Sequence, residues 1–332
     1  MLLAACLERL PSATRVTVGS SDTIQDREEL LGQLRAKLPR IAHELPTTTP
    51  AYITEGLRWA SSNGSKLEWW LRAKTSATFP QDVRIFAQSV VMDQLDGEGA
   101  DAPHTVVSGD EAIHDPDHGR LDLFGNVQVR LSDGFLIKSE FAHYFTESGT
   151  YLVPPPFEGT GEGTLDNGQH LFFRATGLIY RPETQEMLLL LASHVELDET
   201  LIESDQALFL RTDHKAEFWA HHYRPPKKRW VSIRKPDLWV QSRTAEFLYG
   251  KSVVKVLIAH QDVTLEDRSQ IDAVRYGTCG RALFDRELDQ IDLTEYPQVY
   301  QGQDTVTGEW IRMKRKQNIV EVERSNAFSE SQ

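Results

Sequence analysis

A strand-like frame recurs along this chain. The stretch LDLFGNVQVRL, residues 121–131, has apolar side chains at alternate positions on both sides of a Gly-Asn pair. Alternation with a period of two is typical of a β-strand with one apolar face, and the Gly-Asn pair predicts a bend or bulge. The frame L-x-L-x-x-x-V-x-V occurs at four places, filled by Leu121, Leu123, Val127 and Val129; by Leu189, Leu191, Val195 and Leu197; by Leu257, Ala259, Val263 and Leu265; and by Ile291, Leu293, Pro297 and Val299.

The spacing of these copies predicts a repeat protein. Their starts lie 68, 68 and 34 residues apart, which indicates a unit of 34 residues with degenerate copies between. A second motif precedes the copies. It consists of a small residue, two variable residues and an alanine, and it occurs at Ser139 to Ala142, Ser204 to Ala207, Ser242 to Ala245 and Cys279 to Ala282. Tetratricopeptide arrays share this period, but their apolar residues recur every three or four positions. The period of two therefore favours two strands per unit and an all-β fold of stacked hairpins.

The N-terminal part has a different texture. Residues 21–38 have leucines at helical spacing and predict a helix, alone or as a stalk, followed by a linker containing Pro39, Pro46 and Pro50. Cys6 follows Leu-Ala-Ala, which resembles a bacterial lipoprotein lipobox and indicates a lipidation site. A signal peptide needs a longer basic and apolar leader than the five residues before Cys6, so either the true start lies upstream or the match is chance. The sequence contains no run of eighteen apolar residues, so it predicts no membrane-spanning helix.

Charge and motifs exclude several function classes. The formal net charge of −13 over 332 residues argues against nucleic acid as the main partner, because such proteins have a dominant basic face. The densest basic cluster runs from Arg224 to Lys235 and includes Lys227, Lys228 and Arg229; it forms either a solvated loop or a rim that binds phosphates. No nucleophile elbow, His-Glu-x-x-His motif or phosphate loop occurs. We therefore expect no enzyme activity, no cofactor and no metal, with a polysaccharide-active enzyme as a low alternative.

Four segments resemble components of lipopolysaccharide transport. IESDQALFL, residues 202–210, is similar to the strand that opens the OstA-like domain of LptA, a periplasmic lipopolysaccharide carrier. LDLFGNVQV and VLIAHQDVTLED resemble the strand signature of the same family. GSKLEWWLRAKTSATF, residues 64–79, is similar to the opening of LptC, its membrane-anchored partner. The chain resembles a fusion in which residues 46–197 are LptC-like and residues 198–332 are LptA-like, after an anchor or helical segment at residues 1–45.

The resemblance implies an open β-jelly-roll, or β-taco, that shields the acyl chains of lipid A between the inner and outer membranes. The alternation alone is compatible with either a filled sandwich core or an open groove. The groove walls expected from the resemblance are Leu121, Leu123, Val127, Val129, Ile137, Phe141, Phe173, Leu189, Leu191, Val195, Ile202, Leu208 and Leu210. The alternative function is a structural or adhesive β-repeat protein with a filled core.

The resemblance also implies partners and a place in the cell. The family's domains stack edge to edge, so we expect contacts with the inner-membrane transporter LptB/F/G, with the outer-membrane protein LptD, or with a second copy in a homo-oligomer. The strand NIVEV, residues 318–322, is the expected C-terminal edge. The family's transmembrane anchor has no counterpart here. A periplasmic protein held to the membrane by a lipid on Cys6 is the corresponding expectation.

Overall fold

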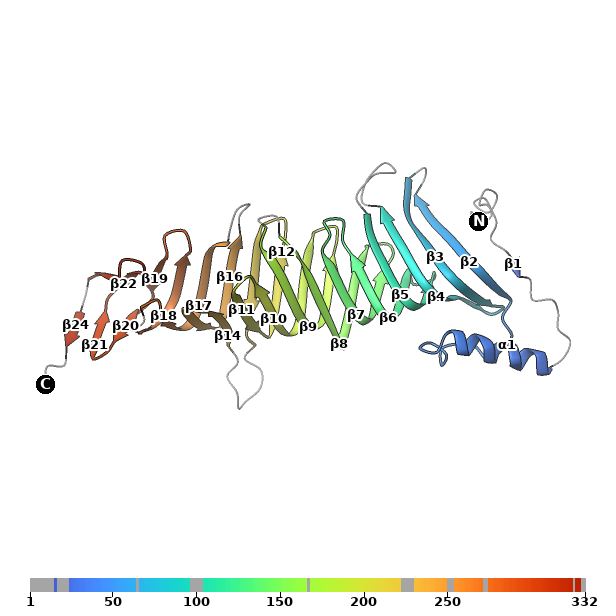
Figure 1. Cartoon of the computed structure of the whole chain (residues 1–332), viewed down its shortest axis with the longest axis horizontal. Helices are drawn as coiled ribbons and strands as arrows, with labels where there is room; N and C mark the ends of the chain where they lie inside the picture. The colour runs from blue at the N-terminus through green and yellow to red at the C-terminus, as the bar shows by residue number, and fades with distance from the viewer. Residues whose placement is uncertain are drawn as a thin grey trace. The chain divides into compact units, whose positions relative to one another are not determined.

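The computed structural model confirms the all-β prediction. It describes residues 15–16, 24–63, 66–95, 104–165, 168–221, 230–249, 254–270, 274–324 and 326–329. Stacked antiparallel strands and one helix make up this part of the chain (Figure 1). The chain divides into two compact units, Met1–Phe157 and Glu158–Gln332. The division expected after residue 197 falls inside the second unit, and the assignment of the two parts to LptC-like and LptA-like segments stays a prediction.

The first unit is a meander of long strands. Each strand from β2 to β6 pairs antiparallel with the next one in the sequence, and the two-residue strand β1 pairs antiparallel with β2. Such a chain of hairpins needs only short connections. The elements are β1 (Arg15–Val16), α1 (Ile24–Lys37), β2 (Tyr52–Asn63), β3 (Lys66–Phe79), β4 (Asp82–Leu95), β5 (His104–Asp115), β6 (Arg120–Arg130), β7 (Leu136–Phe145) and β8 (Thr150–Thr164), the last of which runs into the second unit.

The second unit contains long and short strands, and their pairings follow two separate paths. The strands are β9 (His170–Arg181), β10 (Glu186–Leu197), β11 (Thr200–Ser204), β12 (Gln206–Leu210), β13 (Lys215–Trp219), β14 (Val231–Lys235), β15 (Leu238–Ser242), β16 (Thr244–Tyr249), β17 (Val254–Asp267), β18 (Arg275–Asp285), β19 (Gln290–Thr294), β20 (Gln298–Gln301), β21 (Asp304–Thr307), β22 (Trp310–Lys314), β23 (Ile319–Glu323) and β24 (Asn326–Ser329).

We call the two paths arm A and arm B. Arm A links β12, β13, β16, β19, β22 and β23, whereas arm B links β11, β14, β15, β20, β21 and β24. The long strands β9, β10, β17 and β18 belong to both paths, one half in each arm. Arm A therefore ends at β23, which contains the expected edge, and arm B ends at the additional strand β24.

A corner divides each long strand into its two halves. In β6 the corner residues Gly125 and Asn126 have φ angles of 71° and 46°, and the pairing with β7 shifts register there. In β17 the equivalent residues Gln261 and Asp262 have φ angles of 63° and 53°. Positive φ values are uncommon for residues other than glycine and mark sharp bends. The predicted bend at Gly-Asn is confirmed, and the repeated frame consists of two strand halves around such a corner.

The second sequence motif stabilises the same corners from the neighbouring strand. The hydroxyl groups of Ser139, Ser204 and Ser242 each donate a hydrogen bond to the carbonyl oxygen two residues later, at 2.9, 2.8 and 2.9 Å. The alanines that close the motif are buried beside the corner, where the arms converge and a larger side chain has no room; they are Ala142, Ala207, Ala245 and Ala282. The spacing therefore encodes a corner with its own hydrogen bond.

The two arms face each other in each unit. In the first unit, arms A and B are the halves of β2 to β7 on the two sides of the corners, and Trp59 of arm B contacts His114 of arm A at a ring centroid distance of 4.4 Å. In the second unit, the ring centroid of Phe173 of arm B lies 6.4 Å from that of Phe209 of arm A. We call the surfaces that meet in this way the inner faces.

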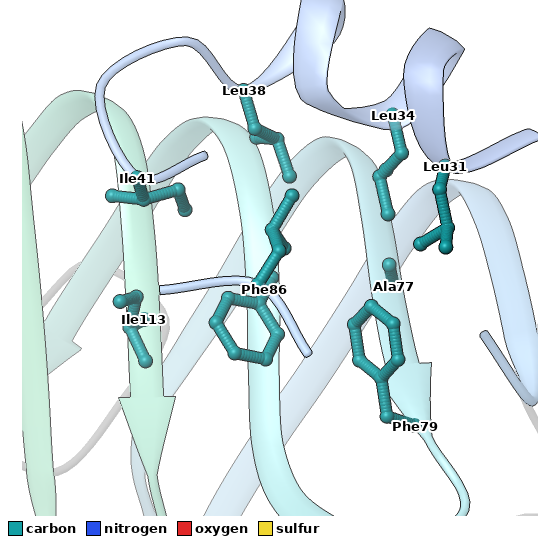
Figure 2. Packing of buried hydrophobic residues seen from close by; sticks show 9 residues of the cluster. Leu31, Leu34, Leu38, Ile41, Ala77, Phe79, Phe86 and Ile113 are labelled. Carbon is teal, nitrogen blue, oxygen red and sulfur yellow. The ribbon is translucent and has the colours of Figure 1, made fainter. Parts of the chain in front are cut away.

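Helix α1 packs against the outer face of arm A in the first unit (Figure 2). Leu31, Leu34, Leu38 and Ile41 are buried against a patch that includes Phe86. The full patch is Ala77, Phe79, Phe86 and Ile113, with Ile53 and Phe124 at its margin. The helix is thus not a stalk, because its leucine stripe is covered by the sheet.

Hydrogen bonds fix the chain directly after the helix. The backbone N–H groups of Arg40 and Ile41 donate to the carboxylate of Glu111, at 3.0 Å to its Oε2 atom in each case. The Arg40 guanidinium lies 3.2 Å from the Glu140 carboxylate. Glu111 is buried, so the two amide donors satisfy a carboxylate that would otherwise be costly to bury.

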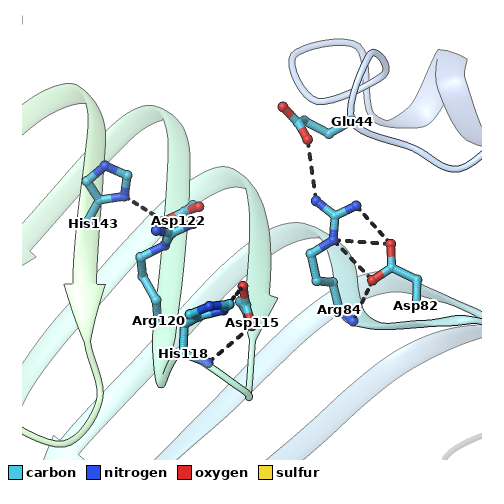
Figure 3. A network of polar contacts seen from close by, with 8 residues as sticks. All are labelled: Glu44, Asp82, Arg84, Asp115, His118, Arg120, Asp122 and His143. Atoms are coloured by element: carbon cyan, nitrogen blue, oxygen red, sulfur yellow. Dashed lines mark hydrogen bonds and ion pairs between the residues drawn. The ribbon is translucent and has the colours of Figure 1, made fainter.

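Ion pairs continue along the outer face beyond the helix (Figure 3). Arg84 contacts the Asp82 carboxylate at 2.8 Å and the Glu44 carboxylate at 3.4 Å. The hydrogen bond from Arg84 lowers the pKa of Asp82 below its ordinary value. Further along, Asp122 accepts from His143 at 2.6 Å. These polar contacts mark the outer face as the solvated side of arm A.

The packing of α1 predicts the cost of truncating its central leucine. Leu34→Ala removes a fully buried side chain from the patch and is expected to lower the free energy of unfolding by about 2–5 kcal/mol. Gln33→Ala, on the exposed side of the same turn, is expected to change it by less than about 0.5 kcal/mol. Urea unfolding of both variants measures the difference. Equal, small effects would contradict the docking of α1.

Candidate functional site

The inner face of arm A in the second unit alternates large and small side chains. Phe209 pairs with Ala216, and Ala207 pairs with Phe218 on the neighbouring strand. The rings form a continuous row, with centroid distances of 6.0 Å from Phe209 to Phe218 and 5.5 Å from Phe218 to Phe247. Aromatic rings beside alanines fill a narrow space without gaps. The result is a broad apolar wall that faces arm B.

Most of the expected groove residues lie on the inner faces. In the first unit these are Leu121, Leu123, Val127, Val129 and Ile137, and in the second unit Phe173, Leu189, Val195 and Ile202. All nine are at most 3% exposed. The structure thus brings them together within each unit as buried apolar walls. Their contact with a lipid stays a prediction.

Four expected groove residues lie elsewhere, and the corners explain why. Leu191 is 46% exposed because the second copy of the frame begins two residues earlier than the spacing predicts, at Met187, which puts Leu191 at the corner. Leu208 and Leu210 alternate with the buried residues Ala207 and Phe209 and so face outward.

Phe141 is the fourth. A corner in β7 reverses the alternation between Ile137 and Ala142, so that Phe141 faces outward. Its ring contacts Phe124 and Phe157 at centroid distances of 4.8 and 5.0 Å, in an outer cluster of the first unit. A simple period of two cannot be extended across a corner, because the bend changes which side of the chain faces inward.

The remaining expected site residues lie outside the described residues. They are Cys6, the expected lipidation site, and Lys227, Lys228 and Arg229, the expected phosphate rim.

A buried histidine interrupts the apolar inner face of the first unit. His114 is 6% exposed and packs against the rings of Trp59 and Trp69, at centroid distances of 4.4 and 6.2 Å. Among the described residues its Nδ1 atom has no hydrogen-bond partner. Burial lowers the pKa of His114 from 6.5 to about 4, so the ring is neutral at pH 7.

The edges of the two arms opposite the corners form a charged cleft in the second unit. The cleft has a volume of about 590 Å³. Turn residues of both arms line it: Asp198, Glu199, Thr200, Lys235, Pro236 and Asp237 from arm B, and Phe284, Arg286, Asp289, Arg315 and Lys316 from arm A. We call it the mouth cleft, since it lies where the apolar interior meets solvent.

Arg315 connects the arms at one end of the mouth cleft. Its guanidinium donates to Asp289 of its own arm at 2.9 Å, and across the cleft to Asp267 at 3.0 Å and to Asp237 at 2.5 Å. Asp267 is 1% exposed and also lies 3.9 Å from Arg275, which is equally buried. These carboxylates hold the pKa of Arg315 above its ordinary value against the opposing effect of burial. The network is a polar clasp across the interior.

Lys235 and Arg286 line the mouth cleft beside this clasp. The Lys235 ammonium of arm B lies 4.7 Å from the centre of the Phe284 ring of arm A. Burial, and then the nearby charge of Arg286, lower the pKa of Lys235. Within the part of the chain that the structure describes, neither cation forms an ion pair or a hydrogen bond through its side chain. A narrow gap lined by Leu197, Phe247, Leu257 and Phe284 continues from this point into the apolar interior.

The sequence prediction does not include the polar residues of the interior, although the alternation along their strands indicates that they face inward. Asp267 continues the inner positions of Val263 and Leu265, and Lys235 continues those of Val231 and Ile233. A charged residue at an inner position of a strand is expensive to bury unless it is paired. Such positions are therefore markers of a functional or structural network.

Comparisons with known proteins give little that bears on this site. No family model matches the sequence, and no curated protein matches it. Among solved structures, the chain is similar to the crystal structure of LptH, the LptA homologous periplasmic component of the lipopolysaccharide transport device from Pseudomonas aeruginosa. The identity is 14%, the match covers 40% of this chain and 95% of that chain, and the TM-score is 0.36. A similarity at this level carries no weight for the function.

Two further features of the described residues concern membranes and metals. The single helix found there is too short and too polar to cross a bilayer. In the same residues, no three His, Cys, Asp or Glu side chains converge in a way that suits a metal ion.

The buried histidine predicts a specific pH dependence of stability. The unfolded chain binds a proton at His114 below about pH 6.5 and the folded chain only below about pH 4, so protons favour unfolding between these values. His114→Phe is expected to remove roughly 2–3 kcal/mol of the stability loss on acidification through this window. Urea unfolding at pH 7 and pH 4 measures it. His170→Asn, at an exposed position, should leave the loss unchanged, and an unchanged loss in His114→Phe would contradict the prediction.

The clasp predicts a large effect of removing Arg315. Arg315→Met leaves the carboxylate of Asp267 buried with a weakened partner set, and we expect a loss of about 3–5 kcal/mol in the free energy of unfolding. Arg324→Met removes an arginine whose pair with Glu309 is exposed, and should cost less than about 1 kcal/mol. Thermal unfolding of the two variants compares their melting temperatures. Similar melting temperatures for the two variants would contradict a clasp.

Proposed function

We propose that this protein is a non-enzymatic carrier of lipopolysaccharide, which takes the acyl chains of lipid A between its two arms. The observation that carries the proposal is the pair of facing apolar inner faces, lined by large side chains such as Phe173 and Phe209, that ends at a charged mouth. The resemblance of the sequence to LptA and LptC segments supports the same ligand class. In this proposal the protein works in the periplasm, anchored through a lipid on Cys6.

Physical chemistry favours a carrier with this architecture. Each CH₂ group of an acyl chain costs about 0.8 kcal/mol to leave in water, so a molecule with several chains crosses an aqueous space only when it is shielded. Apolar inner faces remove that cost without any chemical step. A chain that binds by exclusion of water needs no catalytic residues, which agrees with the absence of catalytic motifs in the sequence.

The arms must part to admit acyl chains, because side chains fill the space between the inner faces. Contacts across the interior are mostly apolar, such as Phe173 with Phe209 at 6.4 Å, and acyl chains replace such contacts at little net cost. The corners are bends within single strands, so they act as hinges while the strand pairing inside each arm stays intact. We infer that the walls separate at the mouth and stay joined at the corners.

The strand edges provide contacts for a bridge. Among the described strands, β23 pairs only with β22 and β24 only with β21, so one side of each remains open for pairing. Unpaired N–H and C=O groups on such edges bind a strand of another domain. In the proposal these edges meet the inner-membrane transporter LptB/F/G, the outer-membrane protein LptD, or a second copy of the chain.

A second candidate function is a structural or adhesive β-repeat protein. The filled interior favours it, since Leu123, Phe173 and Leu189 are completely buried without any ligand. The two candidates differ in whether a lipid reaches the inner faces.

A photo-crosslinker on each side of one strand tests the proposal. p-Azidophenylalanine at Phe247, on the inner face, is expected to crosslink to lipopolysaccharide on irradiation, whereas the same residue at Leu248, on the outer face, is not. Phe247 is 3% exposed and Leu248 is 37% exposed, so the pair differs in face and not in location along the strand. Immunoblotting for lipopolysaccharide adducts reports the result. Equal or absent labelling at both positions would favour the filled-core alternative.

A further inference from the structure

We propose that the mouth cleft of the second unit binds a phosphate group through Lys235 and Arg286, an inference that rests on the proposed function. Lys235 is the last residue of the basic cluster that the sequence singles out, whereas Arg286 lies outside that cluster. The two cations come from different arms, at the end of β14 and just after β18, and they meet at the mouth.

The location of the two cations suits an amphiphile. Four residues line both the polar mouth cleft and the apolar gap beneath it: Thr200, Lys235, Phe284 and Arg286. This is the boundary at which a bound lipid changes from polar headgroup to acyl chain. A headgroup phosphate at that depth leaves the first carbons of the chain against Phe284.

Within the described residues, neither cation forms an ion pair or a hydrogen bond through its side chain. The carboxylates of Asp237 and Asp289 contact Arg315 and attract the Lys235 ammonium only from a longer distance. The carboxylate of Asp198 accepts hydrogen bonds from the side-chain amide of Gln169, at 2.6 Å, and from the backbone of His170, at 3.2 Å. Glu199 and Lys316, both exposed at the rim, have opposite charges. Lys235 and Arg286 thus lack a direct hydrogen-bond acceptor among the described residues of the cleft.

An anion would offset the cost of holding Lys235 in its present position. The ammonium is partly buried over an aromatic ring, and burial followed by the charge of Arg286 lowers its pKa. A phosphate between the two cations provides the acceptor that both lack, through a forked guanidinium contact and an ammonium contact. The Thr200 side chain lines the same place as a further hydroxyl donor.

Two sources of phosphate share this chemistry, a lipid headgroup and free inorganic phosphate. The mouth cleft, at about 590 Å³, is far larger than one phosphate ion, and it continues into an apolar gap. These two features favour the phosphate of a lipid.

The test compares binding of three probes to the full chain by titration calorimetry. The probes are lipid A with both phosphates, enzymatically dephosphorylated lipid A and inorganic phosphate. We expect the double variant Lys235→Gln/Arg286→Gln to bind phosphorylated lipid A at least about tenfold more weakly than the unchanged protein, with less than a twofold change for dephosphorylated lipid A. Arg130→Gln, at an exposed position of the first unit, removes one charge elsewhere and should change neither.

Each outcome supports or overturns the inference. Equal loss for both lipids, no loss in the double variant, or equal loss in Arg130→Gln overturns it while lipid binding, and so the proposed function, stands. Binding of inorganic phosphate that depends on Lys235 and Arg286, without binding of any lipid, supports the anion site and contradicts the proposed function. If no probe binds, both fail. Arg286→Gln alone, at an exposed position, keeps the test decisive if the double variant does not fold.

Discussion

The bend within the long strands is the constraint on which the rest of this structure depends. A straight strand with the frame of residues 121–131 would present one flat apolar face. The corner at Gly125 and Asn126 turns its two halves toward each other, and the equivalent corner at Gln261 and Asp262 does the same in the second unit. Facing walls, a closed apex and a mouth at the opposite edge follow from that bend. The serine hydrogen bonds and the small alanines exist to accommodate it.

The mouth is where polarity enters an otherwise apolar interior. Arg315 contacts Asp267 and Asp237 of the opposite arm, whereas Lys235 and Arg286 line the cleft beside it and form no ion pair within the described residues. Buried ion networks seldom add much stability over apolar packing. Their value here is geometric, because they fix where the arms meet and leave a charged opening beside the junction. The combination fits a carrier whose ligand has a fatty interior and an anionic surface.

The sequence predicts this architecture as far as local alternation reaches. Alternation, taken together with the resemblance, gives nine of the inner residues, including Leu123 and Val195, because each lies within one strand half. It misplaces Phe141 and Leu191, because a corner changes which side faces inward and the position of a corner is set by pairing with the next strand. The docking of α1 on Phe86 and the clasp at Arg315 join residues far apart in the chain, and no local pattern encodes such contacts.

The distance between the two sides of the mouth tests the central claim most directly. Spin labels on cysteines introduced at Glu199 of arm B and Leu288 of arm A, with Cys6→Ser, report it by electron paramagnetic resonance. Cys279 is no obstacle, since burial raises the pKa of its thiol to about 12 and keeps it unreactive. The account predicts that lipopolysaccharide shifts the distance distribution to longer values. An unchanged distribution with lipopolysaccharide bound would contradict arms that part to hold acyl chains.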